Sequence, residues 1–337
     1  MKVRKFVLAG LVSVSVCAAV SCKKDKNGSD TQATLSGTLD FDSPAYVQKG
    51  EVVKITPKGL SANSVDIGYY WTASPMFSKA DTTRVLGAPD SNDGTYVFTV
   101  KDTTLMTFTI TCYAFAEGYT TKTASYYCTM VDPALGGTIS GDDVDGETPV
   151  FEDGRTGYDL YYKTIGDRDW LVRNIYTDGG HSYLDSPAVD KIFGKLYTWD
   201  EAMEACPSGW RLPSADDWLS LAHVAGYAGN DADADFLGVA GNFMANIYFN
   251  GSRMWEYWPA VKITNDTGFA AMPVGYGMMR SDGPEFVNNL DYAVFWTADS
   301  HDDEQAVYRM INMNKPDVMR GVAHKDSFLA SVRCVRN

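Results

Sequence analysis

Apolar and polar side chains alternate in short runs along the first half of the chain, and Gly, Pro, Asn and Asp separate these runs. In the clearest run, one face carries Phe108, Ile110, Cys112 and Ala114, and the other carries Thr107, Thr109, Thr111 and Tyr113. A period of two residues indicates a strand with one buried face. Further runs rich in β-branched and aromatic residues fall at 51–55, 67–71, 96–100 and 122–131. Residues 34–133 are therefore predicted to form an all-β sandwich.

Helix signals appear only in the second half of the chain. Thr198 and Glu201 have the spacing of a capping box, which predicts a helix that runs to about Cys206 and stops at the following proline. A second helix is expected to start at Ser214. Its buried face is marked by Trp218, Leu221, Ala222 and Ala225.

The rest of the second half is loop-rich, with short apolar stretches between polar segments. Residues 154–337 are therefore predicted to form an α+β domain with two helices and long loops. Residues 134–153 are rich in Gly, Asp and Pro and have no periodicity, which favours a linker. The length of 337 residues also suits two domains better than one.

The first residues have the form of an export signal. Three basic residues precede an apolar stretch, Phe6 to Val20, that is shorter than the roughly 20 residues of a membrane-spanning helix. Residues 19–22, Ala-Val-Ser-Cys, resemble a bacterial lipobox, which implies removal of residues 1–21 and lipidation of Cys22. An unmodified secretory signal is the alternative. Residues 22–33 are expected to be a flexible tether, and the protein is expected to be lipid-anchored in the outer membrane and exposed at the cell surface.

The charge balance limits the partners. The net charge is −14, so the chain is expected to avoid nucleic acid and anionic lipid headgroups and to contact a membrane only through its lipid anchor. Aromatic residues make up 13% of the chain, which suits both protein cores and surfaces that stack on sugars.

Four cysteines remain after Cys17 and Cys22 are assigned to the signal and the anchor. Four cysteines allow three pairings, and proximity favours two local bonds, Cys112 with Cys128 and Cys206 with Cys334. An exported protein can keep such bonds. For the first pair a free buried thiol is the alternative, because both cysteines fall on the apolar faces of their strands.

Seven ordered blocks of the second half carry a family resemblance. They are residues 169–175, 193–199, 206–214, 217–218, 268–276, 295–298 and 331–335. Over Gly154 to Asn337 the chain resembles the Fibrobacter succinogenes major paralogous domain. It departs from the family at Val172-Arg173-Asn174-Ile175, where Ala-Glu-Asn-Leu is usual, and at Arg211, where His is common.

This resemblance implies a fold and a role. The family is similar to C-type lectins, in which a disulfide ties the first helix to the last strand, so Cys206 and Cys334 are the implied partners. It implies a non-catalytic binding or adhesion module with ligands near the long loops. The first domain, with a central Trp and evenly spaced strands, resembles the immunoglobulin-like sandwiches of bacterial surface lipoproteins and is expected to act as a spacer.

Candidate ligand residues lie in three segments. Trp255, Tyr257 and Trp258 sit in a loop-rich stretch and are candidates for stacking on sugar rings, with core packing as the alternative. Asp299, His301 and Asp302 follow a predicted strand and are a candidate ligand or calcium loop, although a solvated acidic loop is favoured and no metal or other cofactor is expected. Asn312 and Asn314 are expected to present amides from a strand, unless they only make its surface polar.

Enzymatic signatures are absent from the sequence. The four His are dispersed, and no Gly-x-Ser-x-Gly, His-Glu-x-x-His or phosphate-loop motif occurs. The main hypothesis is therefore a non-catalytic surface lipoprotein whose C-terminal domain binds a glycan or a surface protein. The alternatives are a diversified protein-binding receptor and a structural component of the envelope or matrix.

Overall fold

The computed structural model describes residues 32–61, 65–74, 84–87, 93–100, 107–131, 150–155, 158–249, 252–255 and 261–337. The chain divides into two compact units, Met1–Met130 and Val131–Asn337. The expected signal and Cys22 lie outside the described residues. Within the described ranges, no helix has the length and apolar character needed to cross a membrane.

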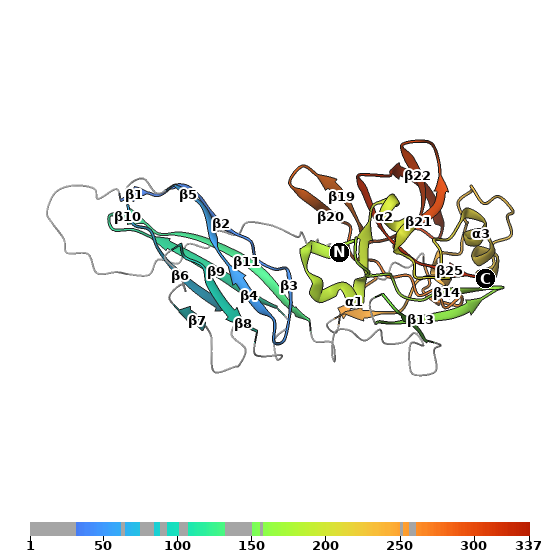
Figure 1. The fold of residues 1–337 in the computed structure, drawn as a ribbon, viewed down its shortest axis with the longest axis horizontal. Helices are drawn as coiled ribbons and strands as arrows, with labels where there is room; N and C mark the ends of the chain where they lie inside the picture. Colours follow the sequence, from blue (N-terminus) through green and yellow to red (C-terminus); the bar gives the residue numbers. More distant parts are fainter. Residues whose placement is uncertain are drawn as a thin grey trace, which may run out of the picture. The chain divides into compact units, whose positions relative to one another are not determined.

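The first unit is built from strands (Figure 1). They are β1 Ala33–Thr34, β2 Ser36–Phe41, β3 Tyr46–Gln48, β4 Val52–Ile55, β5 Pro57–Ser61, β6 Gly68–Ser74, β7 Arg84–Gly87, β8 Tyr96–Thr99, β9 Thr107–Phe115, β10 Tyr119–Thr120 and β11 Lys122–Val131. One sheet has the order β3-β11-β9-β6-β7, and further pairs are β2–β5, β4–β8 and β1–β10. The predicted β-rich character of this half is confirmed.

An apolar cluster joins strands of this unit. Trp71 on β6 is fully buried, and its ring meets the Phe41 ring of β2 edge-on, with centroids 4.9 Å apart. Its indole N–H donates to the Gly94 carbonyl at 2.9 Å, which satisfies the one polar group that burial would otherwise leave unpaired. Val53 and Ile55 of β4 belong to the same cluster. The large sheet therefore packs against β2 and β4 in two layers.

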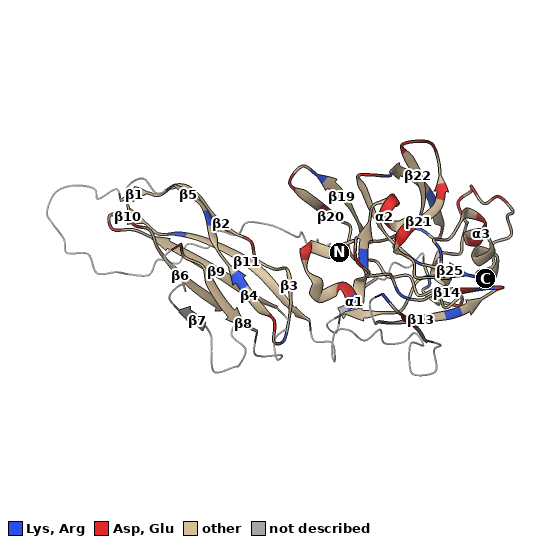
Figure 2. Ribbon diagram, in the orientation of Figure 1, with Lys and Arg blue, Asp and Glu red and all other residues tan. Residues whose placement is uncertain are grey.

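The predicted alternation on β9 is confirmed by burial. Its apolar side chains, including Phe108 and Ile110, are buried in the cluster, and its opposite face is more exposed. The strand carries no charged residue, as Figure 2 also shows. β11 pairs with β9 in an antiparallel register that sets Cys112 opposite Ala124 and Cys128 opposite Phe108.

The proposed Cys112–Cys128 disulfide is wrong, because both cysteines are free, buried thiols. The register separates them by four residues along the sheet, about 13 Å at a rise of about 3.3 Å per residue. Cα atoms must approach to within about 7 Å for a disulfide to form. Burial raises the pKa of each thiol to about 12, which keeps it protonated and unreactive.

The second unit combines two larger sheets and the β17–β18 hairpin with short helices. Its elements are β12 Val150–Asp153, β13 Tyr158–Ile165, β14 Arg168–Leu171, β15 His181–Ser182, η1 Tyr183–Asp185, η2 Pro187–Val189, α1 Asp190–Phe193, β16 Lys195–Tyr197, α2 Trp199–Ala205, α3 Ala215–Val224, η3 Ala240–Asn242, β17 Tyr248–Phe249, β18 Ser252–Arg253, β19 Tyr276–Arg280, β20 Gly283–Val287, β21 Tyr292–Ser300, β22 Gln305–Asn312, β23 Val318–His324, β24 Phe328–Ser331 and β25 Val335–Arg336. One sheet has the order β12-β13-β14-β25. The other has the order β15-β16-β24-β21-β22-β23, and the β19–β20 hairpin joins it at β24.

Both predicted helices are present and begin with capping boxes. In α2 the Thr198 hydroxyl accepts from the Glu201 amide, and the Glu201 carboxylate accepts from the Thr198 amide at 2.8 Å. In α3 Ser214 and Asp217 form the same reciprocal pair. These bonds satisfy amides that have no partner inside the helix, which explains why the sequence marked both starts correctly. The one-turn helix α1 was not predicted.

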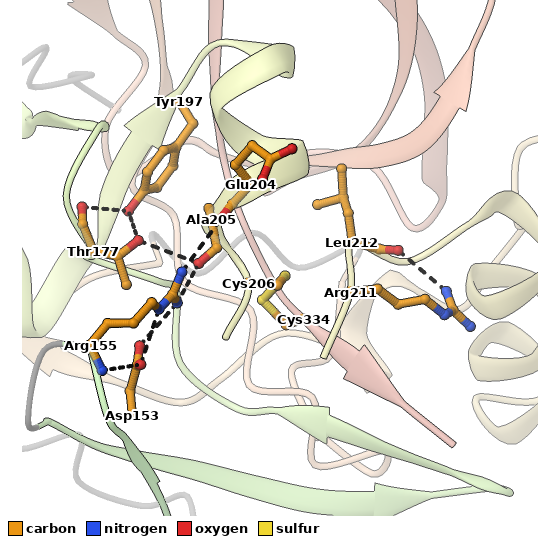
Figure 3. The surroundings of a disulfide bond; sticks show 10 residues. All are labelled: Asp153, Arg155, Thr177, Tyr197, Glu204, Ala205, Cys206, Arg211, Leu212 and Cys334. Carbon is orange, nitrogen blue, oxygen red and sulfur yellow. Dashed lines mark hydrogen bonds and ion pairs between the residues drawn. A yellow bond between two sulfur atoms is a disulfide. The ribbon is translucent and has the colours of Figure 1, made fainter. Parts of the chain in front are cut away.

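A disulfide joins Cys206, at the end of α2, to Cys334, just before β25, with Cα atoms 5.8 Å apart (Figure 3). The predicted bond is therefore confirmed. Beside it, the Arg155 guanidinium donates to the Ala205 carbonyl at 2.8 Å and to the Asp153 carboxylate at 3.0 Å. The beginning of the unit is thus fastened to α2 near the disulfide.

The linker prediction needs a correction at its C-terminal end. Residues 150–153 form β12, which pairs in antiparallel fashion with β13. The second unit therefore begins before the predicted boundary at residue 154. The remaining part of the predicted linker, up to residue 149, lies outside the described residues.

Candidate functional site

The aromatic loop predicted to stack on sugars does not present Trp255 to solvent. The Trp255 side chain is fully buried, and its indole N–H donates to the Ala271 carbonyl at 3.0 Å. The backbone amide of the preceding Met254 bonds to the Ile247 carbonyl at 3.0 Å, which anchors the segment. Trp255 is thus a core residue, and its prediction as a ligand contact is wrong. Tyr257 and Trp258 lie outside the described residues.

The Asp299 side chain binds the start of helix α3 and is not free to bind a ligand. Its carboxylate accepts from the Ala215 amide at 2.7 Å, at the first residue of α3. Its own amide donates to the Thr297 hydroxyl at 3.2 Å. A carboxylate at a helix N-terminus compensates the positive end of the helix dipole, which accounts for this acidic residue structurally.

His301 and Asp302 lie in the turn that joins β21 to β22. The Asp302 carboxylate accepts from the Glu304 amide at 2.9 Å and the Gln305 amide at 2.7 Å, and these bonds hold its pKa below the usual value. The Lys325 ammonium donates to the Asp302 carbonyl at 2.8 Å. The His301 side chain is exposed. Across the described part of the chain, no three His, Cys, Asp or Glu residues are grouped to hold a metal ion.

The two asparagines do not alternate on one strand. β22 ends at Asn312, which is buried, and its side-chain oxygen accepts from the Asn314 amide at 2.7 Å. Asn314 is exposed in the turn that follows. The expectation of two amides presented from a strand is therefore wrong, because the strand ends at Asn312, before Asn314 is reached. Those of the predicted ligand residues that the structure describes do not converge on one site.

Four other aromatic rings contact one another at the edge of the hydrophobic core, and we call this group the aromatic shelf. It consists of Tyr276, Tyr292, Tyr308 and Phe328. Phe328 is stacked between Tyr276 and Tyr308, with centroids 5.2 Å and 5.1 Å apart. The Tyr292 ring meets that of Tyr276 at a right angle, with centroids 6.2 Å apart. The three tyrosines are partly exposed, whereas Phe328 is almost buried.

Four strands place the shelf on one face of the larger sheet. Register sets Trp296 of β21 opposite Tyr308 of β22, and Tyr308 opposite Gly321 of β23. Trp296 is fully buried and packs edge-on against both Tyr308 and Phe328. The shelf is therefore a rigid surface with a buried aromatic ring as its support, rather than a set of mobile side chains.

The shelf consists of apolar ring faces, and the polar groups at its edge are uncharged. Burial, followed by the neighbouring Tyr276, raises the pKa of Tyr308, so its hydroxyl stays protonated and able to donate at physiological pH. The Asn288 amide donates to the Tyr276 hydroxyl at 3.2 Å. Met310 and Met319 are paired across β22 and β23 on the same face as Tyr308 and extend the apolar area. Such a surface suits the faces of sugar rings or an apolar protein patch.

Two shallow hollows lie elsewhere on this unit. One of about 400 Å³ is lined by Gly209, Trp210, Arg211 and Val335 to Asn337. The other, of about 210 Å³, includes Gly241, Lys262 and Pro316. The cationic groups of the first hollow are already engaged: Arg211 bonds to Asp217, and Arg336 bonds to Asp169 at 3.0 Å. Neither hollow contains a shelf residue.

Sequence reasoning missed the shelf although a signal was present. Tyr292, Val294 and Trp296 alternate on β21, as Ala306, Tyr308 and Met310 do on β22. That period marks one face of each strand, but pairing the two faces needs the register, which is not visible in a single sequence.

The second unit matches a known protein family. The family model of the Fibrobacter succinogenes major domain matches residues 164–336, about half of the chain. Among curated proteins, no match to the chain was found.

Proposed function

Because the chain belongs to the Fibrobacter succinogenes major domain family, we propose that it is a non-catalytic lipoprotein of the bacterial cell surface whose C-terminal domain binds a glycan. The lipobox-like segment that ends at Cys22 supports anchoring in the outer membrane. The observation that carries the binding function is the aromatic shelf. Its partly exposed tyrosines offer ring faces for stacking and neutral hydroxyls for hydrogen bonds, which is the combination that a sugar ring requires.

We also propose a C-type lectin-like fold for the second unit and an immunoglobulin-like fold for the first. In the second unit β14, one of its early strands, pairs with β25, the last strand, and the disulfide joins the end of α2 to Cys334, just before β25. Both features support a C-type lectin-like fold. The two-layered strand packing of the first unit supports an immunoglobulin-like spacer.

A non-catalytic role fits the composition of the shelf. Its four rings include no carboxylate, thiol or imidazole, and the raised pKa of Tyr308 keeps that hydroxyl from acting as a base at neutral pH. Asn288, which donates to the Tyr276 hydroxyl, is neutral. We therefore assign the shelf to binding.

A glycan array with the full chain in detergent tests this proposal. The wild-type protein and a Tyr308→Ala variant are compared, with Tyr248→Ala as the matched control, because Tyr248 is an exposed tyrosine of the same unit outside the shelf. We expect Tyr308→Ala to lose the glycan signal and Tyr248→Ala to keep it. Unchanged binding by Tyr308→Ala would remove the shelf as the site, and no binding by the wild-type protein would contradict a glycan ligand.

Recognition of a protein is the second candidate function, and it is based on two methionines beside the shelf. Methionine adapts its shape to irregular apolar partners, and Met310 and Met319 flank the tyrosines. If a panel of matrix and surface proteins binds the wild-type chain and the glycan array does not, the partner is a protein. If the purified chain instead assembles into oligomers through the shelf, the structural role is favoured.

A further inference from the structure

The first unit carries a second unusual surface, on the outward side of β9 and β11. We call it the hydroxyl face. It consists of Thr109, Thr111 and Tyr113 on β9, and Thr123, Ser125 and Tyr127 on β11. The register sets Tyr113 opposite Thr123, Thr111 opposite Ser125, and Thr109 opposite Tyr127, so the six side chains form three consecutive rungs.

The hydroxyl face is open to solvent because the other side of the same strands forms the core. Ile110 and Cys112 point inward and are fully buried. On the outward side Tyr127 is 70% exposed, Thr123 and Ser125 are exposed, and the three β9 residues are partly exposed. The Thr111 and Ser125 hydroxyls bond to each other at 2.9 Å in the middle rung, which leaves further lone pairs for a ligand.

Aromatic rings stand at opposite corners of the hydroxyl face. Tyr113 is at one end on β9, next to the Tyr70 ring of β6 at 5.8 Å between centroids, and Tyr127 is at the other end on β11. The two ends are four residues apart, about 13 Å at about 3.3 Å per residue. A ligand that reaches both ends must therefore be longer than one sugar ring.

No member of the hydroxyl face is charged, although 21% of the chain is charged and the net charge is −14. A solvent-facing sheet is usually kept soluble by charged side chains, so their absence calls for a reason. A polyanion or polycation finds no complementary charge on these six residues. A stable protein interface needs an apolar centre, and here the central rung consists of two hydroxyls. What matches the face is an uncharged polymer that is itself covered with hydroxyls.

We propose that the hydroxyl face binds a linear, uncharged polysaccharide, with Tyr113 and Tyr127 stacking on sugar rings and the intervening hydroxyls exchanging hydrogen bonds with the sugar. The first unit is then a binding module in its own right as well as a spacer. This site is independent of the proposed function of the shelf, because the two surfaces share no residue.

The test is a pull-down of the full chain in detergent on insoluble cellulose, chitin and starch granules. We expect the wild-type chain to partition into at least one pellet, and a Tyr113→Ala/Tyr127→Ala double variant to partition about tenfold more weakly. Ser125→Lys, which puts a charge on the central rung, should weaken it too. Tyr248→Ala, at an exposed tyrosine outside both surfaces, is the control and should bind the pellet as the wild type does.

The variants also separate the two sites. Loss of pellet binding by Tyr308→Ala alone would assign the polysaccharide to the shelf and overturn this inference while leaving the proposed function intact. Wild-type binding by the double variant, or no binding of the wild type to any of the three pellets, would overturn it as well. A wild-type dimer that Tyr127→Ala dissociates would assign the face to a second copy of the chain and contradict a polysaccharide. Thermal melting of each variant checks that the first unit remains folded.

Discussion

The Tyr308 ring lies against Gly321 of the adjacent strand, so closely that a Cβ atom on Gly321 would come within 2.3 Å of the Tyr308 ring carbon Cζ. The absence of a side chain at position 321 therefore lets the ring lie flat on β23. In this position the Tyr308 ring is stacked on that of Phe328, with centroids 5.1 Å apart.

Replacing Gly321 by Ala is expected to push the Tyr308 ring off β23 and to break its stack with Phe328. Overpacking of this kind costs about 1–3 kcal/mol, less where a side-chain end can swing away. We expect glycan binding to fall as in Tyr308→Ala, with a small loss of thermal stability. Gly154→Ala is the matched control, because nothing lies within 4 Å of its Cβ position. Equal binding by both glycine variants would show that the ring position is unimportant.

The Cys206–Cys334 bond is expected to stabilise the second unit strongly. It closes a loop with a sequence separation of 128 residues. In the chain-entropy model a loop of this length contributes about 5 kcal/mol to the free energy of unfolding. Urea unfolding of a Cys206→Ser/Cys334→Ser variant should show a midpoint far below that of the wild type. Cys112→Ser/Cys128→Ser is not a neutral control, because both thiols are buried; the wild type with and without reductant serves instead. An unchanged midpoint on reduction would contradict the prediction.

Asp217 is expected to make the stability depend on acid pH. Burial alone would raise its pKa, but hydrogen bonds from Arg211 and Ser214 outweigh burial and hold the pKa below the usual value. Arg168 also contacts the carboxylate, at 2.7 Å. A lowered pKa in the folded state stabilises the protein above the ordinary Asp pKa of about 3.9, and this stabilisation is lost as the pH falls through the folded value.

The check is urea unfolding from pH 7 to pH 3 for the wild type and Asp217→Asn. We expect the variant to be less stable at pH 7 by about 3 kcal/mol, because its partners Arg168 and Arg211 lose their counter-charge. The difference should shrink as the pH falls below the ordinary Asp pKa of about 3.9 toward the lowered folded-state pKa, because the stabilising charge is lost over that range. A difference that does not change with pH would place the effect in the cap and not in the charge.

Asp190 should have the opposite pH dependence. Burial raises its pKa to about 6, and among the described residues its Oδ1 atom has no hydrogen-bond partner. Between the unfolded pKa near about 3.9 and the folded value, the folded state binds more protons, so this group's contribution to stability falls as the pH rises. Asp190→Asn should therefore gain melting temperature relative to the wild type at pH 7 but not at pH 4. A variant that is less stable at both pH values would contradict the pKa shift.

Local patterns in the sequence were sufficient wherever the physical cause is itself local. The capping boxes at Thr198 and Ser214 depend on residues three positions apart, and the alternation on β9 depends on neighbours two apart. The family membership and the Cys206–Cys334 pairing also followed from the sequence, because ordered blocks identify a fold that brings distant cysteines together.

The predictions that were wrong depend on contacts between residues that are distant in the sequence. Cys112 and Cys128 lie on neighbouring strands, but the register shifts them four residues apart, and a register cannot be counted from either strand alone. Trp255 looked like a loop aromatic, yet the Ala271 carbonyl receives its indole N–H inside the core. Asp299 looked like part of an acidic loop and instead accepts a hydrogen bond from the Ala215 amide at the start of α3.

By itself the sequence determined the division into a β-rich and a mixed half, the helix starts and the family, and the export signal stays a prediction from the sequence. Only the tertiary structure decided which side chains share a surface. The aromatic shelf joins Tyr276, Tyr292, Tyr308 and Phe328 from four strands, and it needs Gly321 from a fifth. Strand order and register bring these residues together, and both result from packing over the whole unit rather than from the preferences of neighbouring residues.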